Sequence, residues 1–146
     1  GGRRVERSML DFYEKWENHP LVIDKWFAVS ASREMSDPIA AMEALTAHPA
    51  YNPSNPNRVR ALVGGFAMNN PTGFHHISGK GYAFFTKQIL DMDSRNPQIA
   101  ARLLGAFEIW RKLDSTRQGL IKDELRRLIA AGPSKNTLEI ATKTLG

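Results

Sequence analysis

Three polar residues near the starts of two related segments could together bind an anion. Gln98 and Arg102 are four residues apart, so they share one face at the start of a predicted helix. Arg60 falls near the start of an earlier segment of the same pattern. If the two helices stack in parallel, two guanidinium groups and two positive helix ends would suit a carboxylate. From spacing alone, ordinary solvated arginines are the simpler interpretation.

The remaining polar residues form no recognisable catalytic or metal-binding motif. His75 and His76 are adjacent on a predicted loop, where neighbouring side chains point in different directions. No histidine belongs to a His-Glu-x-x-His motif, and Gly73 to Gly81 lacks the Gly-Lys-Ser/Thr ending of a phosphate-binding loop. We therefore expect no catalytic residue, no metal ligand and no cofactor in this chain.

A twelve-residue pattern occurs twice, at an offset of 41 residues, as 55–66 and 96–107. Each copy has a capping Asn, a Pro in the first helical position, two apolar residues, a Gly and a Phe. Repeats of about 35 to 45 residues are typical of stacked helical pairs. Gly64 and Gly105 in mid-helix cost about 1 kcal/mol each relative to Ala. We therefore expect a close approach between helices at both glycines.

Helical periodicity runs along the chain, and the alternating pattern of strands is absent. Asp37, Asp114 and Ser134 are predicted N-caps, and one helix is predicted from Pro97 to about Lys112. The predicted inward faces are, in chain order, Val5, Met9, Phe12, Tyr13 and Trp16; Val22, Ile23, Trp26, Phe27 and Val29; Ile39, Met42 and Leu45; Tyr82, Phe85, Ile89 and Met92; Ile99, Leu103, Phe107 and Trp110; Ile121, Leu125, Leu128 and Ile129; and Leu138, Ala141 and Leu145.

Two segments rich in turn-forming residues, 48–54 and 69–81, are predicted to interrupt the helices. The second is long enough to be either functional or packed by its own side chains. The predicted fold class is all-α, an α-α superhelix of about eight short antiparallel helices. We expect residues 1–146 to form one helical-repeat domain, with residues 1–2 as a cloning remnant.

Composition limits the possible partners of the chain. Its net charge is +5, but the basic residues are scattered among acidic ones without the aromatic interleaving of a nucleic-acid surface. Its apolar runs are far shorter than the roughly 20 residues of a membrane span. The absence of cysteine fits a reducing compartment. We expect a cytoplasmic protein that binds neither nucleic acid nor membranes.

Several uncommon motifs follow one another along nearly the whole chain: Asp24-Lys25-Trp26-Phe27, His48-Pro49, Asn55-Pro56-Asn57-Arg58-Val59-Arg60, Gly81-Tyr82 and Asn96-Pro97-Gln98-Ile99-Ala100-Ala101-Arg102-Leu103. In this order and approximate spacing they resemble the end of bacterial-type aminopeptidase N, a zinc metallopeptidase of the gluzincin class. The resemblance implies the last part of a large helical C-terminal domain that covers the active-site cleft. That domain would enclose a cavity and restrict the entry of peptides.

The resemblance also implies roles for particular residues. Arg60, Gln98 and Arg102 match family positions that line the cavity and approach the bound peptide substrate. The zinc ligands of His-Glu-x-x-His and the free-amine recognition motif Gly-x-Met-Glu-Asn do not occur here. Zinc and hydrolysis would belong to a catalytic domain elsewhere in the same polypeptide, and the chain alone should be inactive. The segment 74–78 departs from the family version.

A second hypothesis remains open at this point. The same stacked helices could form a free-standing helical-repeat scaffold that binds a protein along its concave face. The two hypotheses differ in whether the natural reading frame continues upstream into a His-Glu-x-x-His segment.

Overall fold

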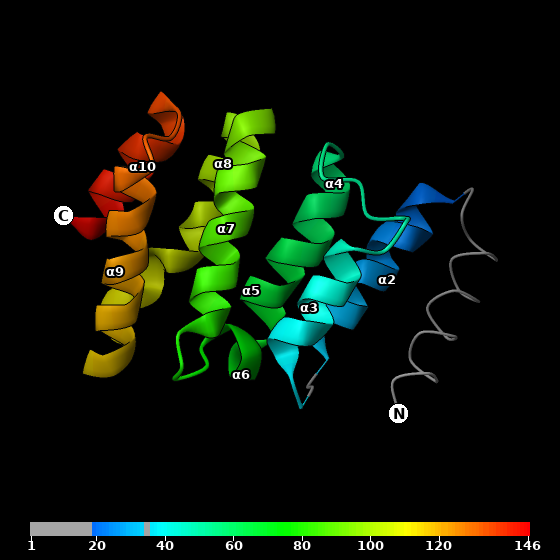
Figure 1. The fold of residues 1–146 in the computed structure, drawn as a ribbon, viewed down its shortest axis with the longest axis horizontal. Helices are drawn as coiled ribbons and strands as arrows, with labels where there is room; N and C mark the ends of the chain where they lie inside the picture. The colour runs from blue at the N-terminus through cyan, green and yellow to red at the C-terminus, as the bar shows by residue number, and fades with distance from the viewer. Residues whose placement is uncertain (1–18, 34–35) are drawn as a thin grey trace.

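The computed structural model describes residues 19–33 and 36–146, which are helical apart from short connections (Figure 1). The predicted helix with Val5 to Trp16 lies outside the described residues. The elements are α2 (Pro20–Ser32), α3 (Pro38–Thr46), α4 (Pro56–Val59), the π-helix η1 (Arg60–Gly64), α5 (Gly65–Asn69), α6 (Pro71–Phe74), α7 (Lys80–Arg95), α8 (Pro97–Leu104), the 3-10 helix η2 (Gly105–Lys112), α9 (Ser115–Ala130) and α10 (Lys135–Leu145).

The helices stack in two layers along the molecule. In one layer α7 packs against both α3 and α9. In the other layer η1 packs against α2 and α8, and α8 packs against α10. Figure 1 shows that α7 and α8 run in opposite directions, as the short turn between them requires. The predicted all-α architecture of stacked antiparallel helices is confirmed.

Side chains cap the helices at the predicted positions. The Asn55 side chain accepts from the backbone N–H groups of Asn57 and Arg58 at 3.1 and 3.2 Å, and Pro56 follows it at the first helical position. Asp37, Asn96, Asp114 and Ser134 likewise accept from backbone N–H groups three residues later. Each cap satisfies an N–H that would otherwise have no partner within its helix.

The core is built from most of the predicted apolar positions, but the buried stripe is shifted on α2, α8 and α10. All four residues predicted for α7, Tyr82, Phe85, Ile89 and Met92, are buried. Val29 is instead 45% exposed, because Ile23, Phe27 and Ala31 form the buried stripe of α2 at a four-residue spacing. On α10, Leu138 is 38% exposed because Thr137 and Ala141, also four residues apart, face inward. On α8 the buried residue is Leu104, four residues after Ala100, and Leu103 is only partly buried.

Neither copy of the repeated pattern is one regular helix. In the first copy, the π-helix η1 separates α4 from α5. In the second copy, α8 gives way at Gly105 to the 3-10 helix η2, so the single predicted helix from Pro97 to Lys112 is wrong. A 3-10 helix repeats every three residues, which keeps Phe107 and Trp110 on the same buried side.

The expected close approaches at Gly64 and Gly105 do not occur. A Cβ placed on Gly64 would meet Leu103 at an ordinary 3.6 Å, and one on Gly105 would meet only Glu108 at 3.9 Å. The close approach lies one residue later, at Gly65, where a Cβ would be 3.2 Å from the Ala28 carbonyl oxygen of α2. A second one is at Gly81, whose Cβ would overlap the carbonyl oxygens of Gly73 and Phe74.

The predicted interruption at 69–81 is shorter than expected, because it contains α6 and the first residues of α7. Asn70 caps α6 by accepting from the Gly73 N–H at 3.1 Å, and Phe74 is fully buried. Gly79 has a φ of 79°, the left-handed conformation that favours glycine, and α7 begins directly after it. The segment is therefore packed by its own side chains. Within 19–33 and 36–146, no helix is long and apolar enough to span a membrane.

Candidate functional site

The two helices that carry the predicted binding residues begin at the same edge of the molecule. Figure 1 shows the starts of α4 and α8 at its upper edge. There, Arg95 Nη1 donates to Ser54 Oγ at 3.0 Å. These two residues directly precede the capping residues Asn55 and Asn96. The parallel arrangement on which the sequence argument depended is therefore present.

All three predicted residues lie on the surface. Arg60 is exposed, and its Nη2 donates to the side-chain oxygen of Asn57 at 2.7 Å, a neutral partner. Gln98 and Arg102 are also exposed. Among the described residues, no hydrogen bond or ion pair joins these three side chains to one another. Their role in substrate binding stays a prediction.

The neighbouring Arg58 has a structural role that the sequence analysis missed. It is buried, and its Nε donates to Asp24 Oδ1 while its Nη1 donates to the Ala50 carbonyl oxygen. Its guanidinium carbon also lies 5.7 Å from the centre of the Phe27 ring. Arg58 thus fastens α4 to α2 and to the connection after α3, which leaves Arg60 as the exposed arginine of the motif. The sequence did contain an indication of this role, because Asp24 and Arg58 each belong to a motif that carries the family resemblance.

A buried carboxylate fixes the start of α10 beside the end of α7. Asp93 Oδ2 accepts from the Ser134 N–H at 2.7 Å, and Asp93 Oδ1 accepts from the hydroxyls of Ser134 and Thr137, each at 2.6 Å. Burial opposes ionisation of Asp93, but the hydrogen bonds outweigh it and hold the pKa of this carboxyl below its usual value. The turn between α7 and α8 is therefore held by hydrogen bonds to two other parts of the chain, from Asp93 to the start of α10 and from Arg95 to Ser54.

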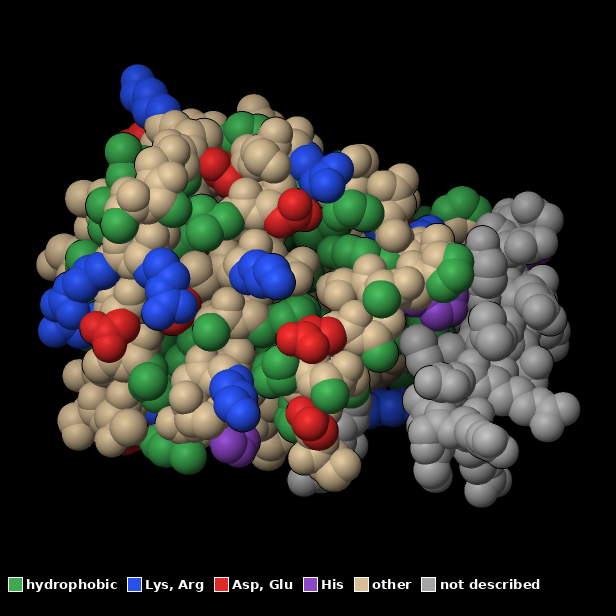
Figure 2. All heavy atoms as spheres, in the orientation of Figure 1, with side chains coloured by type: hydrophobic (Ala, Val, Ile, Leu, Met, Phe, Trp, Pro, Cys, Tyr) green, Lys and Arg blue, Asp and Glu red, His purple; other side chains and the backbone are tan. Residues whose placement is uncertain are grey.

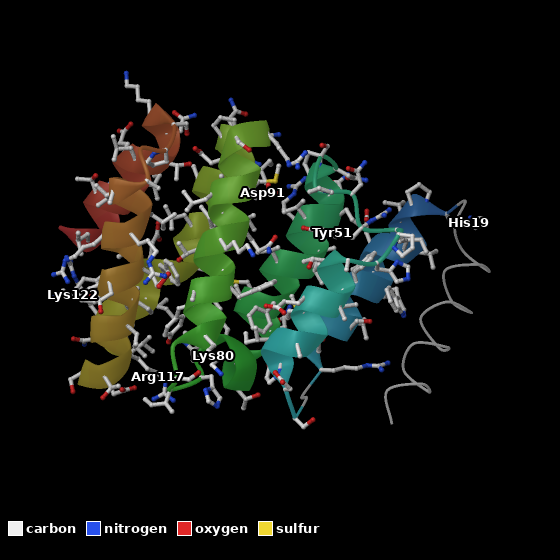
Figure 3. The ribbon with its side chains drawn as sticks, viewed as in Figure 1. His19, Tyr51, Lys80, Asp91, Arg117 and Lys122 are labelled. Carbon is white, nitrogen blue, oxygen red and sulfur yellow. The ribbon has the colours of Figure 1, made fainter. Side chains whose placement is uncertain are left out.

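A second polar cluster lies at the opposite edge, where Figure 3 labels Arg117 and Lys80. His75 Nδ1 is 2.6 Å from the Tyr82 hydroxyl, and Arg117 Nε donates to the His75 carbonyl oxygen at 2.6 Å. Arg117 also pairs with Asp114 at 2.8 Å. The adjoining shallow hollow of about 620 Å³ is lined by Pro71, Thr72, His75, His76, Ile77, Leu113, Asp114 and Arg117.

The pKa values of His75 and Tyr82 are both shifted in the direction that favours the neutral form. Burial, with a smaller contribution from Arg117, lowers the pKa of His75. Burial raises the pKa of Tyr82 to about 12, while Arg117 opposes and Asp114 assists that shift. A neutral imidazole and a neutral phenol can share a hydrogen bond without a charge. The cluster therefore joins segment 75–79 to α9.

The described part of the chain does not fit a catalytic metal. His75, His76 and Asp114 line one hollow, but no three His, Asp or Glu residues of 19–33 and 36–146 are grouped so that they could hold a metal ion. Figure 2 shows Lys and Arg interspersed with Asp and Glu over the face in view.

The sequence matches a known family over almost its whole length. Residues 2–146 match the model of a domain of unknown function, DUF3458_C, described as ARM repeats. The chain belongs to this family. The DUF3458_C match agrees with the stacked helical layers and the repeat at 41 residues.

Curated relatives of this DUF3458_C chain are aminopeptidases N. It is 44% identical to the protein of Caulobacter vibrioides over 100% of the chain and 17% of that protein. Identity is 41% with the Haemophilus influenzae protein, over 94% of the chain and 16% of the relative. Identity is 37% with the Escherichia coli protein, over 82% of the chain and 14% of the relative. The chain therefore spans about one-sixth of the length of these relatives.

A solved structure has the same fold. The crystal structure of Legionella pneumophila aminopeptidase A in complex with aspartic acid superposes with a TM-score of 0.90 at 33% identity. The match covers 99% of this chain and 17% of that one. Together these findings confirm the resemblance of the DUF3458_C chain to the C-terminal helical domain of aminopeptidase N.

Proposed function

We propose that the chain is the C-terminal, cavity-forming and substrate-access domain of a zinc-dependent aminopeptidase that removes N-terminal residues from peptides. The observation that carries this proposal is the match of the whole chain to about one-sixth of an aminopeptidase N. The remaining five-sixths would hold the catalytic centre and its zinc, because no residue group described here suits that metal. In this proposal residues 1–146 act as one domain of a cytoplasmic enzyme of peptide catabolism.

The proposed contacts to substrate are those of Arg60, Gln98 and Arg102. Their helices, α4–η1 and α8, start at one edge and run in parallel, which supports a shared surface. Neither arginine pairs with a carboxylate of a described residue, so both charges are available to a peptide carboxylate. Gln98, one helical turn before Arg102, would hydrogen-bond the peptide backbone.

The test is a kinetic comparison in the full-length enzyme. Arg102→Ala should lower kcat/KM for peptides by about 10- to 100-fold, since a hydrogen bond to a charged group contributes about 1.5 to 3 kcal/mol. Single-residue amide substrates, which do not extend beyond the scissile bond, should change far less. Arg126→Ala is the matched control, because Arg126 is exposed on α9 and pairs with Asp123 of the same helix.

Two outcomes would count against the proposal. Equal losses for peptides and single-residue amides would remove the proposed substrate contact of Arg102. A natural reading frame without an upstream His-Glu-x-x-His segment would favour the free-standing scaffold.

A further inference from the structure

A small hollow beside Trp110 has a rigid and partly apolar floor. It measures about 330 Å³ and lies between η2 and α10. Trp110 is only 7% exposed, and its Nε1 donates to the Thr144 carbonyl oxygen at 2.9 Å. Ile140 also lines the hollow. Because the indole is held by packing and by a hydrogen bond, a ligand could settle here without rearranging it.

Two cations lie over this indole, and a third lines the hollow beside it. Arg111 of η2 lies 5.0 Å and Lys122 of α9 lies 5.7 Å from the centre of the ring. Lys143 of α10 lines the hollow, and Glu108 is the one acidic residue among its lining residues. Figure 3 labels Lys122 at the left edge, and Figure 2 shows Lys and Arg side chains gathered on that edge.

These three cations differ from the arginines of α9. Arg117, Arg126 and Arg127 each have a carboxylate within 4.0 Å. No described residue forms such an ion pair with Arg111, Lys122 or Lys143. The lining residues Arg111, Lys143 and Glu108 give the hollow a net charge of +1, and Lys122 against the same indole ring brings the charge around Trp110 to +2. Like charges held around one ring repel each other, and this repulsion would be relieved by an anionic ligand.

We propose that the Trp110 hollow is a docking surface for an acidic segment from the part of the longer polypeptide outside these 146 residues. Two carboxylates would neutralise the charge of +2 around Trp110. An apolar side chain beside them would pack against Trp110 and Ile140. The relatives are about six times as long as this chain, so the rest of the same polypeptide is present at a high effective concentration. This inference rests on the proposed function in one respect, that the chain is a domain of a longer enzyme, and not on the proposed substrate contacts.

The experiment measures lysine reactivity in the full-length protein. Lys143 and Lys25 are both exposed in these 146 residues, and Lys25 lies on α2 at the other end of the array. If an acidic segment covers the hollow, Lys143 should be acetylated at least ten-fold more slowly than Lys25. A zero-length carbodiimide should also couple Lys143 or Lys122 to an Asp or Glu outside the 146 residues. Protection should weaken in 0.5 M salt, an ionic strength of roughly three times the physiological value.

Substitutions separate charge from simple coverage. Arg111→Gln with Lys122→Gln should return the acetylation rate of Lys143 to within about two-fold of Lys25. Arg126→Gln, which removes a paired cation from the same helix, should leave Lys143 protected. The proposal is overturned if Lys143 reacts as fast as Lys25, if its protection is independent of salt, or if the carbodiimide products join two copies of the protein. These readouts are independent of peptidase kinetics, so a failed Arg102 test would not affect them.

Discussion

Asp93 accepts hydrogen bonds from both the backbone N–H and the hydroxyl of Ser134, 41 residues later in the chain. The carboxylate of α7 therefore supplements the N-cap of α10 and lies at the positive end of that helix. This contact and the Ser54–Arg95 hydrogen bond span the same interval, which is the interval of the sequence repeat.

Asp93→Asn should loosen the start of α10. The variant loses the charge of a carboxylate that accepts three hydrogen bonds, which should cost about 2 kcal/mol or more. Hydrogen exchange of the first-turn amides of α10 in the full-length protein should accelerate roughly 30-fold. Asp91→Asn is the control, because Asp91 is exposed and pairs with Arg95 only within its own helix. An equal effect of both substitutions would contradict the capping role.

The same carboxylate predicts an acid-sensitive contact. The pKa of Asp93 is lower in the folded protein than its usual value of 3.8. Its stabilising contribution is therefore complete above about pH 4 and is lost as the pH falls through the folded pKa. Protection of α10 in the natural protein should decline over this range, and the Asp93→Asn variant should lack that part of the decline.

Gly81→Ala should destabilise the protein, because the new methyl group would overlap two backbone carbonyl oxygens of α6. Overpacking of this kind costs about 1 to 3 kcal/mol. Gly119→Ala makes a matched comparison in α9, since the new Cβ would have no described atom within 4 Å apart from its chain neighbours and the adjoining backbone of its own helix. That substitution should stabilise by about 0.5 to 1 kcal/mol through helix propensity. Urea midpoints that shift in the same direction for both variants would argue against this packing explanation.

Removal of the two arginines of the Asn-Arg-Val-Arg motif should have very different effects on stability. Arg58→Ala leaves Asp24 and the Ala50 carbonyl without their partner in a mostly buried position, which should cost about 3 kcal/mol. Arg60→Ala removes an exposed side chain, and stability should change by no more than about 0.5 kcal/mol. Thermal unfolding of the two variants checks this difference. A large loss of stability in Arg60→Ala would show that Arg60 too is structural.

His75 should make stability depend on pH below neutrality. Its lowered folded pKa means that the unfolded chain binds a proton first, so stability falls as the pH decreases from 6.5 toward the folded pKa. His75→Gln should flatten the stability curve in this window. His76→Gln is the comparison, because His76 is exposed and its Nδ1 contacts Ser78, a near neighbour in the chain. The idea fails if the two variants give the same pH profile.

Local rules predicted most of the helices and only part of their packing. Asp37, Asn55, Asn96 and Asp114 cap helices as expected, because capping depends on residues within one turn. The π-helix at Arg60 and the 3-10 helix at Gly105 were not predicted, because the apolar spacing of both copies is compatible with a regular α-helix. The glycine prediction failed because the sequence pattern does not specify which residue of Gly64-Gly65 faces α2.

The candidate site was predictable to a similar extent. Periodicity placed Gln98 and Arg102 on one helix, and the offset of 41 residues brought the starts of α4 and α8 to one edge. The buried position of Arg58, the Asp93 cap and the cations around Trp110 depend on contacts 34 or more residues apart or between separate helices. Such contacts depend on how the layers stack. Short sequence patterns do not specify that arrangement.

The ties at Ser54–Arg95 and Asp93–Ser134 also bear on how the chain folds. Each joins two residues that are one repeat length, 41 residues, apart. Neighbouring units can therefore form their contacts independently of distant parts of the chain. Folding in such an array can nucleate in any unit and spread to the next. Removal of a whole unit would then leave a shorter array, whereas a cut between the partners of one tie would unravel the unit that it closes.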